Sequence, residues 1–454
     1  MNYCIMSKFI KEYNDDNIKE LIERVKKIDR NEYKEYEDEN IFINFYDKKL
    51  TSPWFPIESY GPWIYDINNN LIYEAGGYGM LGFGYNNKQI NEILGKEYTM
   101  ANIMTPNIIQ YKFSREFNRV TNNRYNGIMA LNSGSEINEL AFRIADYNYK
   151  KSENNKKTPV LVIMEGSFHG RTYLSAQASD NSKENYKKYL GTYELFLKNY
   201  KFIINDIDSV IKVYDEIEKN NEYPILTLIE PVMGEGNPGM AITPEFYRCI
   251  RNITNKNKTL LLIDSIQAGI RATGHLSIVT YPEFNLTDEE LPDMETFSKA
   301  INGGQYPLSI LAVKNRELHQ TGIYGNTMTA NPRGLNVGTY ILSNINSEFI
   351  NNIQKMGKYL LFKLDILKQN NPKIIERISG TGLLCAIHLY QKYDSIEIER
   401  YIRNKGLNVI HGGKNGIRLT PWFLINENEI NLIIDIINEV FSNLDNIYEL
   451  NYII

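Results

Sequence analysis

Asp264 and Lys299 have the residue types and the spacing to hold and activate a cofactor. Asp264 ends the apolar run of residues 260–263, and Lys299 closes a later expected strand just before Gly303 and Gly304. An acid at a strand end can keep a pyridine nitrogen protonated, and a lysine can form a Schiff base. The pair therefore suggests pyridoxal phosphate (PLP).

Each of these two residues also has an ordinary explanation. Aspartate is a good helix N-cap, and a single lysine is usually a solvated surface charge. However, an aspartate that ends a buried strand loses hydration unless a cationic partner compensates, and a pyridinium N–H is one such partner. The cofactor interpretation therefore depends on the motifs upstream.

Residues 132–136 (Asn-Ser-Gly-Ser-Glu) precede an expected helix and could bind an anion. Ser133, Gly134 and Ser135 can offer backbone N–H groups and hydroxyls at the positive end of the helix dipole. The alternative is a plain cap made by Ser133 or Ser135, with Glu139 in the first turn. Taken alone, this motif favours the cap.

Two further polar loops follow apolar runs, at the strand ends where open α/β sheets bind ligands. In the first loop, Phe168 or His169 could stack on a flat ring, and Arg171 could hold a carboxylate in a bidentate manner. In the second, Glu230 could hydrogen-bond the surroundings of a cofactor. The alternatives are an aromatic anchor with a surface arginine, and a turn begun by Pro231.

The elements around these motifs indicate an α/β fold. Ile137, Leu140, Ala141 and Ile144 share one face of a helix expected over residues 136–147. Short continuous apolar runs fit parallel strands covered by helices on both faces. These runs are residues 160–164, 225–229, 260–263 and 308–313.

The two ends of the chain predict a smaller α+β domain. Apolar residues at helical spacing, Ile18, Leu21, Ile22 and Val25, indicate an N-terminal helix followed by a tether. A hairpin over residues 62–73 could complete the C-terminal part, which is expected to form a helix (349–367), a strand with a glycine entry (378–389) and a closing helix (427–444).

Composition narrows the class of protein. The 454 residues are 43% hydrophobic and 23% charged, an ordinary globular balance, and the net charge of −5 argues against a nucleic-acid partner. Three scattered cysteines favour a reducing compartment, and the histidine spacing gives a metal site little support. Without an expected signal peptide or membrane span, a soluble cytoplasmic protein is predicted.

Taken in order, the motifs resemble those of the class III aminotransferases, a PLP-dependent family of fold type I that includes ornithine, acetylornithine and 4-aminobutyrate aminotransferases. The resemblance covers residues 63–444, nearly the whole chain. Any one motif is weak, but the ordered set is specific. It comprises residues 132–136, residues 167–171, Glu230 with Gly234 and Glu235, Asp264 with Gln267, Lys299, and residues 327–332.

The resemblance implies a role for each matching position. Lys299 would form the Schiff base and move protons, Asp264 would pair with the pyridine nitrogen, and Gln267 would reach the ring hydroxyl oxygen. Phe168 and Ile266 would cover the two ring faces, with Gly134 and Ser135 on the phosphate. The remaining assignments are Thr327 on the phosphate of the neighbouring subunit in a homodimer, Arg171 on a substrate carboxylate, and Glu235 with Arg418 as a pair that adjusts the pocket.

Several positions depart from the family pattern. Ser265 replaces the usual glutamate after the aspartate, and Thr329 with Ala330 replaces a glycine pair. Residues 83–86 replace a histidine-rich segment. Gly76 lies where ornithine aminotransferase has a substrate-contacting tyrosine, although Tyr78 is close enough to compensate. These changes leave the cofactor chemistry intact and leave the substrate open, ornithine especially.

The resemblance implies a mostly parallel seven-stranded sheet in a large domain (108–345). A smaller domain would come from residues 51–107 and 346–454, and residues 1–50 would form a helical extension. The expected reaction moves an amino group from an ω-amine or amino acid to 2-oxoglutarate or pyruvate. An aminomutase or racemase on the same fold, or a catalytically silent scaffold, remain the alternatives.

Overall fold

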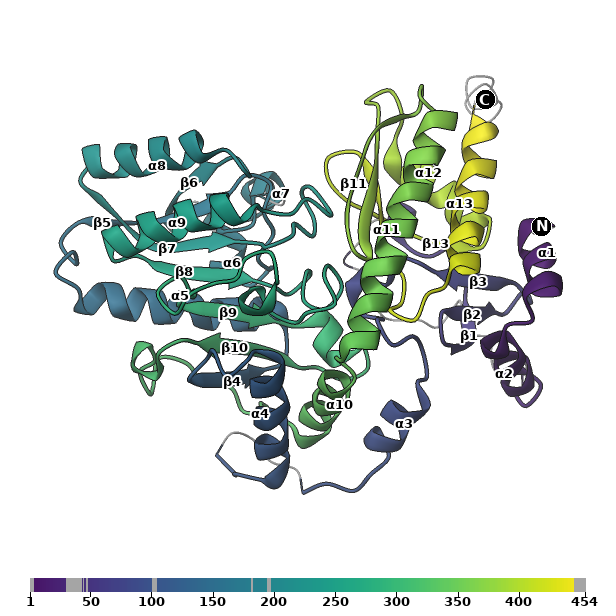
Figure 1. Cartoon of the computed structure of the whole chain (residues 1–454), viewed down its shortest axis with the longest axis horizontal. Coiled ribbons are helices and arrows are strands. Elements are labelled where there is room, and N and C mark those ends of the chain that lie inside the picture. Colours follow the sequence, from purple (N-terminus) through teal and green to yellow (C-terminus); the bar gives the residue numbers. More distant parts are fainter. Residues whose placement is uncertain are drawn as a thin grey trace. The chain divides into compact units, whose positions relative to one another are not determined.

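The protein is described here from a computed structural model. It describes residues 4–29, 43, 45, 48–99, 104–180, 183–193 and 197–444. The chain divides into two compact units, one formed by Met1–Asn91 with Asn352–Ile454 and the other by Glu92–Asn351 (Figure 1). Asp264 and Lys299 both belong to the second unit.

A seven-stranded sheet forms the centre of the second unit, in the order β4-β10-β9-β8-β7-β5-β6. Neighbours from β9 to β6 pair in parallel, as expected for strands that are buried on both faces. The strands are β4 (Gly127–Leu131), β5 (Thr158–Met164), β6 (Lys198–Phe202), β7 (Glu222–Ile229), β8 (Leu260–Asp264), β9 (Met294–Phe297) and β10 (Ser309–Val313).

The run over residues 308–313 is a strand, but the expectation of a parallel strand there is wrong. β10 pairs antiparallel with both β4 and β9. Parallel neighbours need a long crossover, usually a helix, and only the short 3₁₀ turn η7 (Lys299–Asn302) is found between β9 and β10. Apolar content indicates burial on both faces but carries no information on strand direction.

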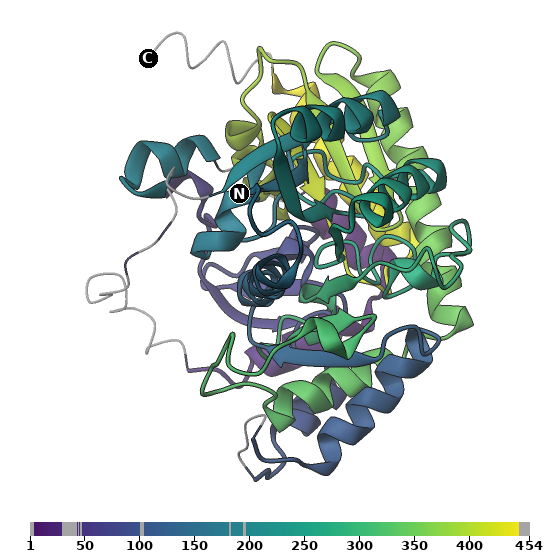
Figure 2. The same ribbon diagram turned by 90° about the vertical axis from the view of Figure 1, so that its left-hand side faces the viewer.

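Helices cover both faces of this sheet (Figures 1 and 2). Helix α5 lies on one face, and its residues Ile137, Leu140, Ala141 and Ile144 are buried, as the sequence predicts. Helices α8 and α9 lie on the other face, as right-handed crossovers require. The helices are α4 (Ile108–Val120), α5 (Gly134–Lys151), α6 (Tyr173–Gln177), α7 (Lys183–Tyr189), α8 (Ile207–Lys219), α9 (Pro244–Asn257) and α10 (Pro332–Ser343).

The first unit contains two four-stranded sheets. The predicted hairpin is confirmed, and its second strand pairs in parallel with β13 from the C-terminal part of the chain. The first sheet comprises β1 (Pro56–Tyr60), β2 (Trp63–Asp66), β3 (Leu71–Glu74) and β13 (Leu407–Asn408). The second comprises β11 (Ile375–Thr381), β12 (Leu384–Leu389), β15 (Gly416–Leu419) and β14 (Ile410–His411).

The single strand expected over residues 378–389 is wrong, because the chain turns back within it. β11 and β12 form an antiparallel hairpin that reverses at Gly382 and Leu383. Gly382 has a φ of +56°, a conformation that glycine adopts without steric cost. The glycine therefore marks the turn rather than the entry to a strand.

Helices α1 (Cys4–Tyr13), α2 (Asp16–Val25), α12 (Ser395–Asn404) and α13 (Glu427–Ser442) pack in this unit. The predicted N-terminal helix is α2, which buries Ile18, Leu21 and Val25 but leaves Ile22 42% exposed. Most of the expected tether lies outside the described residues. Helices α3 (Lys88–Leu94) and α11 (Ser347–Asn370) extend across the boundary between the units. Among the described helices, none has the length and apolar character needed to cross a bilayer.

Candidate active site

The carboxylate of Asp264 is buried at the end of β8 and is held by two neighbouring side chains. Its Oδ2 atom lies 2.8 Å from Nδ1 of His169 and accepts a hydrogen bond of 2.8 Å from Nδ2 of Asn138. Its Oδ1 atom accepts a hydrogen bond from the backbone N–H of Ile266. Asp264 is 4% exposed, so these bonds compensate for lost hydration and fix the direction of the carboxylate.

Asn138 lies in the first turns of α5 and was not among the residues expected in the site. Its amide also donates to the backbone oxygen of His169 at 2.7 Å, and its Oδ1 atom accepts from the hydroxyl of Thr296 on β9 at 2.9 Å. Asn138 is fully buried, but the sequence around it does not show that its amide meets the end of a strand. Asn138 therefore ties α5, β8 and β9 together at the strand end.

Lys299 contacts Gln267, three residues after Asp264. The Nζ atom of Lys299 donates a hydrogen bond to Oε1 of Gln267, whereas the buried Nε2 atom of Gln267 has no partner among the described residues. Lys299 has a φ of +44°, which is uncommon for a residue with a side chain and is typical of functional sites that hold strain. Lys299, which is expected to form the Schiff base, and Gln267, which is expected to reach the ring hydroxyl oxygen, are thus in direct contact.

Glu230, directly after β7, organises the loop that carries Phe168. Its carboxylate accepts hydrogen bonds from the backbone N–H groups of Phe168 (3.1 Å) and Gly234 (2.8 Å). Burial raises the pKa of Glu230 to about 7, and the charge of Asp264 acts in the same direction. Gly234 packs so closely on Gln267 that a Cβ there would lie 2.4 Å from Cγ of Gln267.

Phe168 and Arg171 stack on each other at the rim of this loop. The guanidinium carbon of exposed Arg171 lies 5.4 Å from the ring centroid of Phe168, which is half-buried. The backbone N–H of Arg171 donates to the hydroxyl of Ser135 at 3.0 Å. His169, by contrast, is 2% exposed and directs its ring to Asp264, while its buried Nε2 atom has no hydrogen-bond partner among the described residues.

The N-terminus of α5 is capped by Ser133. Its hydroxyl accepts from the N–H of Glu136 at 3.3 Å, and the Glu136 carboxylate accepts from the N–H of Ser133 at 2.9 Å, which is a complete capping box. Glu139, expected in the first turn of this cap, instead accepts from Thr172 and Leu174. Ser133 is therefore the N-cap of α5, which is the alternative role that the sequence analysis gave for it.

Gly134 and Ser135 follow this cap and lie beside the residues after β8. A Cβ on Gly134 would approach Cδ1 of Ile266 to 3.0 Å, so Gly134 lets the start of α5 pack closely against Ile266. Thr327 is exposed, and the residues on either side of it contact the start of α5 of the same chain. Asn326 donates to Glu136, and Asn132 donates to the backbone oxygen of Met328, each at 2.8 Å.

Ser265, which departs from the family pattern, contacts a second buried carboxylate. Its hydroxyl donates to Glu295 of β9, which is fully buried and also accepts from Tyr125, Ser277 and the N–H of Ile278. Burial raises the pKa of Glu295, and these donors oppose the rise. A carboxylate thus lies beside residue 265 although it comes from the neighbouring strand.

The remaining expected site residues are divided between the two units. Glu235 is half-buried in the second unit, whereas Arg418 and Tyr78 belong to the first. Arg418 is 1% exposed on β15 and helps to lower the pKa of Glu399, although burial holds that pKa at about 7. Tyr78 is exposed and has a φ of +48°.

This arrangement combines a lysine amine, a fixed buried carboxylate and a set of unused polar atoms at one edge of a sheet. The buried Nε2 atoms of Gln267 and His169 are polar positions that a flat, hydrogen-bonding ligand could satisfy. The start of α5 offers backbone N–H groups that suit an anion. The site therefore has the composition needed for Schiff-base chemistry on a phosphorylated ring.

Comparisons with known proteins agree with the chemistry that these side chains indicate. The family model described as aminotransferase class-III matches residues 46–441. An acetylornithine aminotransferase of Prochlorococcus marinus is 27% identical over 89% of this chain and 97% of its own length. The same enzyme of Caldanaerobacter subterraneus is 28% identical over 72% of this chain and 78% of its own.

Solved structures share the fold. The ornithine aminotransferase of Toxoplasma gondii, reported with partial occupancy of PLP at its active site, has a TM-score of 0.77 and 18% identity. It covers 95% of this chain and 99% of its own. A transaminase from Virgibacillus has a TM-score of 0.76 and 17% identity, and covers 89% and 97%. At such identities the similarity shows the fold, an α/β architecture with a mixed seven-stranded sheet.

Proposed function

The chain belongs to the class III aminotransferases, whose PLP-dependent reaction is transamination, and we propose that Lys299 is the residue that binds its PLP. The observation that carries this proposal is the contact between Lys299 and Gln267, three residues from the fixed carboxylate of Asp264. When bound, PLP supplies an electron-accepting pyridinium ring and an aldehyde carbon that takes up amines.

The residues present fit this cofactor. The buried Nε2 donor of Gln267 has no acceptor among the described residues, which suits the ring hydroxyl oxygen of PLP. The backbone N–H groups at the start of α5, where Gly134 packs against Ile266, suit a phosphate. We assign Gly134 and Ser135 to the phosphate, Phe168 and Ile266 to the ring faces, and Ser133 to the helix cap that supports them.

The chain's own residues then have distinct tasks. Lys299 would hold the cofactor through its amine and, when the amine is free, would accept and return a proton at Nζ. Asp264 would lie beside the ring nitrogen, with its carboxylate oriented at Oδ2 by the amide of Asn138 and the ring of His169. Glu230 positions Phe168 through its backbone N–H group.

Substrate recognition is assigned to charged side chains. Arg171, exposed and stacked on Phe168, has the reach to bind a carboxylate in a bidentate manner. Glu235, Arg418 and Tyr78 are proposed to adjust the pocket between donor and acceptor. We expect an ω-amine or amino acid as the donor and 2-oxoglutarate or pyruvate as the acceptor. The relatives' names make N-acetylornithine and ornithine the first donors to examine.

We further propose a homodimer in the cytoplasm. The exposed Thr327 is assigned to the phosphate of the neighbouring subunit, and the free Cys249 and Cys385 suit a reducing compartment. Light scattering after size-exclusion chromatography checks the dimer. The Thr327→Ala variant should keep the dimer and weaken PLP binding, whereas unchanged PLP binding would remove Thr327 from the site.

An amino-donor panel tests the proposed function. The holoenzyme is mixed with N-acetylornithine, ornithine, 4-aminobutyrate or lysine, and the visible absorbance of the cofactor and the carbonyl product are followed in a single turnover. At least one donor should change the absorbance and release one product per site. The Lys299→Ala variant should lose the reaction by more than about 10³-fold. A Lys299→Ala enzyme with wild-type turnover would refute the assignment.

A further inference from the structure

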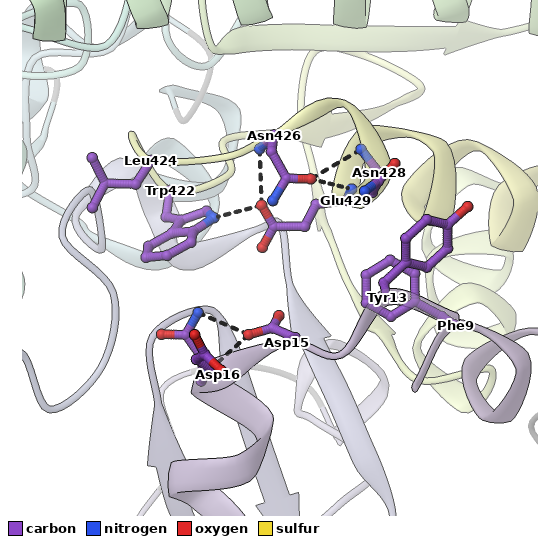
Figure 3. Close-up of a pocket in the computed structure, with 10 residues that line it drawn as sticks. Phe9, Tyr13, Asp15, Asp16, Trp422, Leu424, Asn426, Asn428 and Glu429 are labelled. Carbon is purple, nitrogen blue, oxygen red and sulfur yellow. Dashed lines mark hydrogen bonds between the residues drawn. The ribbon is translucent and has the colours of Figure 1, made fainter. Parts of the chain in front are cut away.

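A pocket in the first unit lies between the N-terminal helices and the start of α13 (Figure 3). Phe9 and Tyr13 of α1 and Asp15, the N-cap of α2, line one side. Trp422 and Glu429 line the other side, together with the N-cap residue Asn426 of α13. None of the residues that line this pocket is assigned to the function proposed above.

Glu429 has an unsatisfied carboxylate oxygen in this pocket. The side chain is 1% exposed, and its Oε2 atom accepts from the N–H of Asn426 (2.9 Å) and from Nε1 of Trp422 (3.4 Å). Its Oε1 atom is buried without a hydrogen-bond partner among the described residues. In Figure 3 this oxygen points across the pocket toward Asp15. Leaving a buried polar oxygen unpaired is costly, which suggests that a hydrogen-bonding partner belongs there.

The opposite wall carries two carboxylates, Asp15 and Asp16, and among the described residues that line it there is no cation. Asp15 accepts from Nε1 of Trp63 at 2.8 Å, and its charge, after burial, helps to raise the pKa of Glu429 to about 8. The buried hydroxyl of Tyr73 also faces Glu429 and lowers that pKa, without reaching hydrogen-bonding geometry. The ten residues that line the pocket include no lysine, arginine or histidine. The pocket is therefore electronegative and lacks a basic side chain of its own.

The aromatic walls decide which kind of cation would fit. The rings of Phe9 and Tyr13 are tilted by 36° with their centroids 4.7 Å apart, and Trp422 lies across the pocket. Carboxylates combined with aromatic faces recognise organic ammonium ions. A metal ion prefers a denser set of oxygen ligands, and the described part of the chain holds no group of three or more side chains suited to one.

We propose that this pocket binds a small organic ammonium ion between the carboxylates of Asp15 and Glu429, with its alkyl groups against Tyr13 and Trp422. An N–H of the ligand satisfies Oε1 of Glu429, and its charge balances the two acids. The site is independent of Schiff-base formation.

Trimethylammonium is the probe, because a tertiary amine cannot form a Schiff base with the cofactor. Its binding to the full-length holoenzyme is measured by titration calorimetry just above the pKa of Glu429, and uncharged tert-butanol serves as a probe of the same shape. Trimethylammonium should bind saturably and tert-butanol should not. Asp15→Asn and Glu429→Gln, which keep the hydrogen-bond acceptors of both caps, should each weaken binding at least about tenfold.

Glu427→Gln is the matched control, since this exposed carboxylate on the same helix pairs with Lys355 at 3.0 Å. It should bind like the wild type. If either acidic variant fails to fold by circular dichroism, Tyr13→Leu replaces it and should also weaken binding. The proposal is overturned if the probe does not saturate, if tert-butanol binds equally well, or if only one of the two carboxylates matters.

Discussion

The side-chain amide of Asn138 donates a 2.8 Å hydrogen bond to the carboxylate of Asp264, from the first turns of α5 to the end of β8. The same nitrogen donates to the backbone oxygen of His169, whose ring binds the same carboxylate oxygen. Asp264 is therefore oriented by two elements that are far apart in the sequence. Asn138 is a positioning residue, because it acts on the proposed cofactor contact through Asp264.

Replacing Asn138 with alanine should weaken PLP binding while preserving the fold. The variant removes a hydrogen bond to a charged group, which contributes about 1.5–3 kcal/mol, so the dissociation constant should rise about tenfold or more. Titration of the apoenzyme with PLP, followed by fluorescence, measures this directly. Asn148→Ala is the control, since Asn148 lies on the same helix and bonds Ile144 and Leu318 instead. Equal losses in both variants would show a general effect on α5.

Much of the candidate site could be predicted because chemistry in an α/β sheet gathers at strand ends. The loops carrying Phe168, Glu230 and Asp264 are connected by hydrogen bonds, and Lys299 contacts Gln267. Phe168, Glu230 and Asp264 each follow an apolar run that the sequence pattern identifies. The roles proposed for them stay predictions.

The parts that could not be predicted depend on contacts between distant segments. Asn138 lies inside a helix, where nothing local shows that its amide meets the end of a strand. The direction of β10 depends on the short connection from β9. In the sequence, Glu295 is a single polar residue in an expected strand. Its contact with Ser265 arises only because β8 and β9 are neighbours in the sheet. Side-chain partners of this kind require the register of the sheet.

The contact between Ser265 and Glu295 predicts that the family's glutamate is not tolerated at position 265 of this chain. Ser265→Glu would place a second carboxylate in a fully buried site that already holds Glu295. Such a pair should lower the free energy of unfolding by about 3–5 kcal/mol. The apparent Tm of the holoenzyme reports the change.

A second substitution makes this prediction specific. In Ser265→Glu combined with Glu295→Val, a single carboxylate remains and can accept from Tyr125 and Ser277, so most of the Tm should return. Ser265→Ala alone should cost only about 1–3 kcal/mol, the effect of removing one donor from a buried acceptor. A Ser265→Glu enzyme as stable as the wild type would contradict the argument.

Arg171→Ala should raise the KM for the keto acid about tenfold and change kcat little. The reason is that the guanidinium is assigned to a carboxylate that is bound equally in the ground and transition states. Steady-state kinetics with a series of keto acids measure the changes in KM and kcat separately. Arg143→Ala is the matched control, because Arg143 is also exposed and lies 5.1 Å from the ring centroid of Tyr324. An unchanged KM for every carboxylate substrate would remove Arg171 from substrate binding.

Glu429→Gln should stabilise the protein at high pH and have little effect at low pH. Burial raises the pKa of Glu429 to about 8 from its ordinary 4.5, so the folded state holds a proton that the unfolded state releases. The stability that this proton contributes is complete below pH 4.5 and is lost as the pH rises through 8. Glutamine resembles the protonated acid and does not titrate.

The free energy of unfolding of Glu429→Gln relative to the wild type should therefore rise by about 4 kcal/mol between pH 5 and pH 9, which is about 1.4 kcal/mol for each pH unit up to the pKa. Thermal unfolding at both pH values, in buffers without organic cations, measures it. Glu427→Gln supplies the baseline, because the exposed Glu427 has no comparable burial. If trimethylammonium at high pH raises the Tm of the wild type but not of Glu429→Gln, the same carboxylate controls both effects. A difference between variant and wild type that does not change with pH would show that Glu429 has an ordinary pKa.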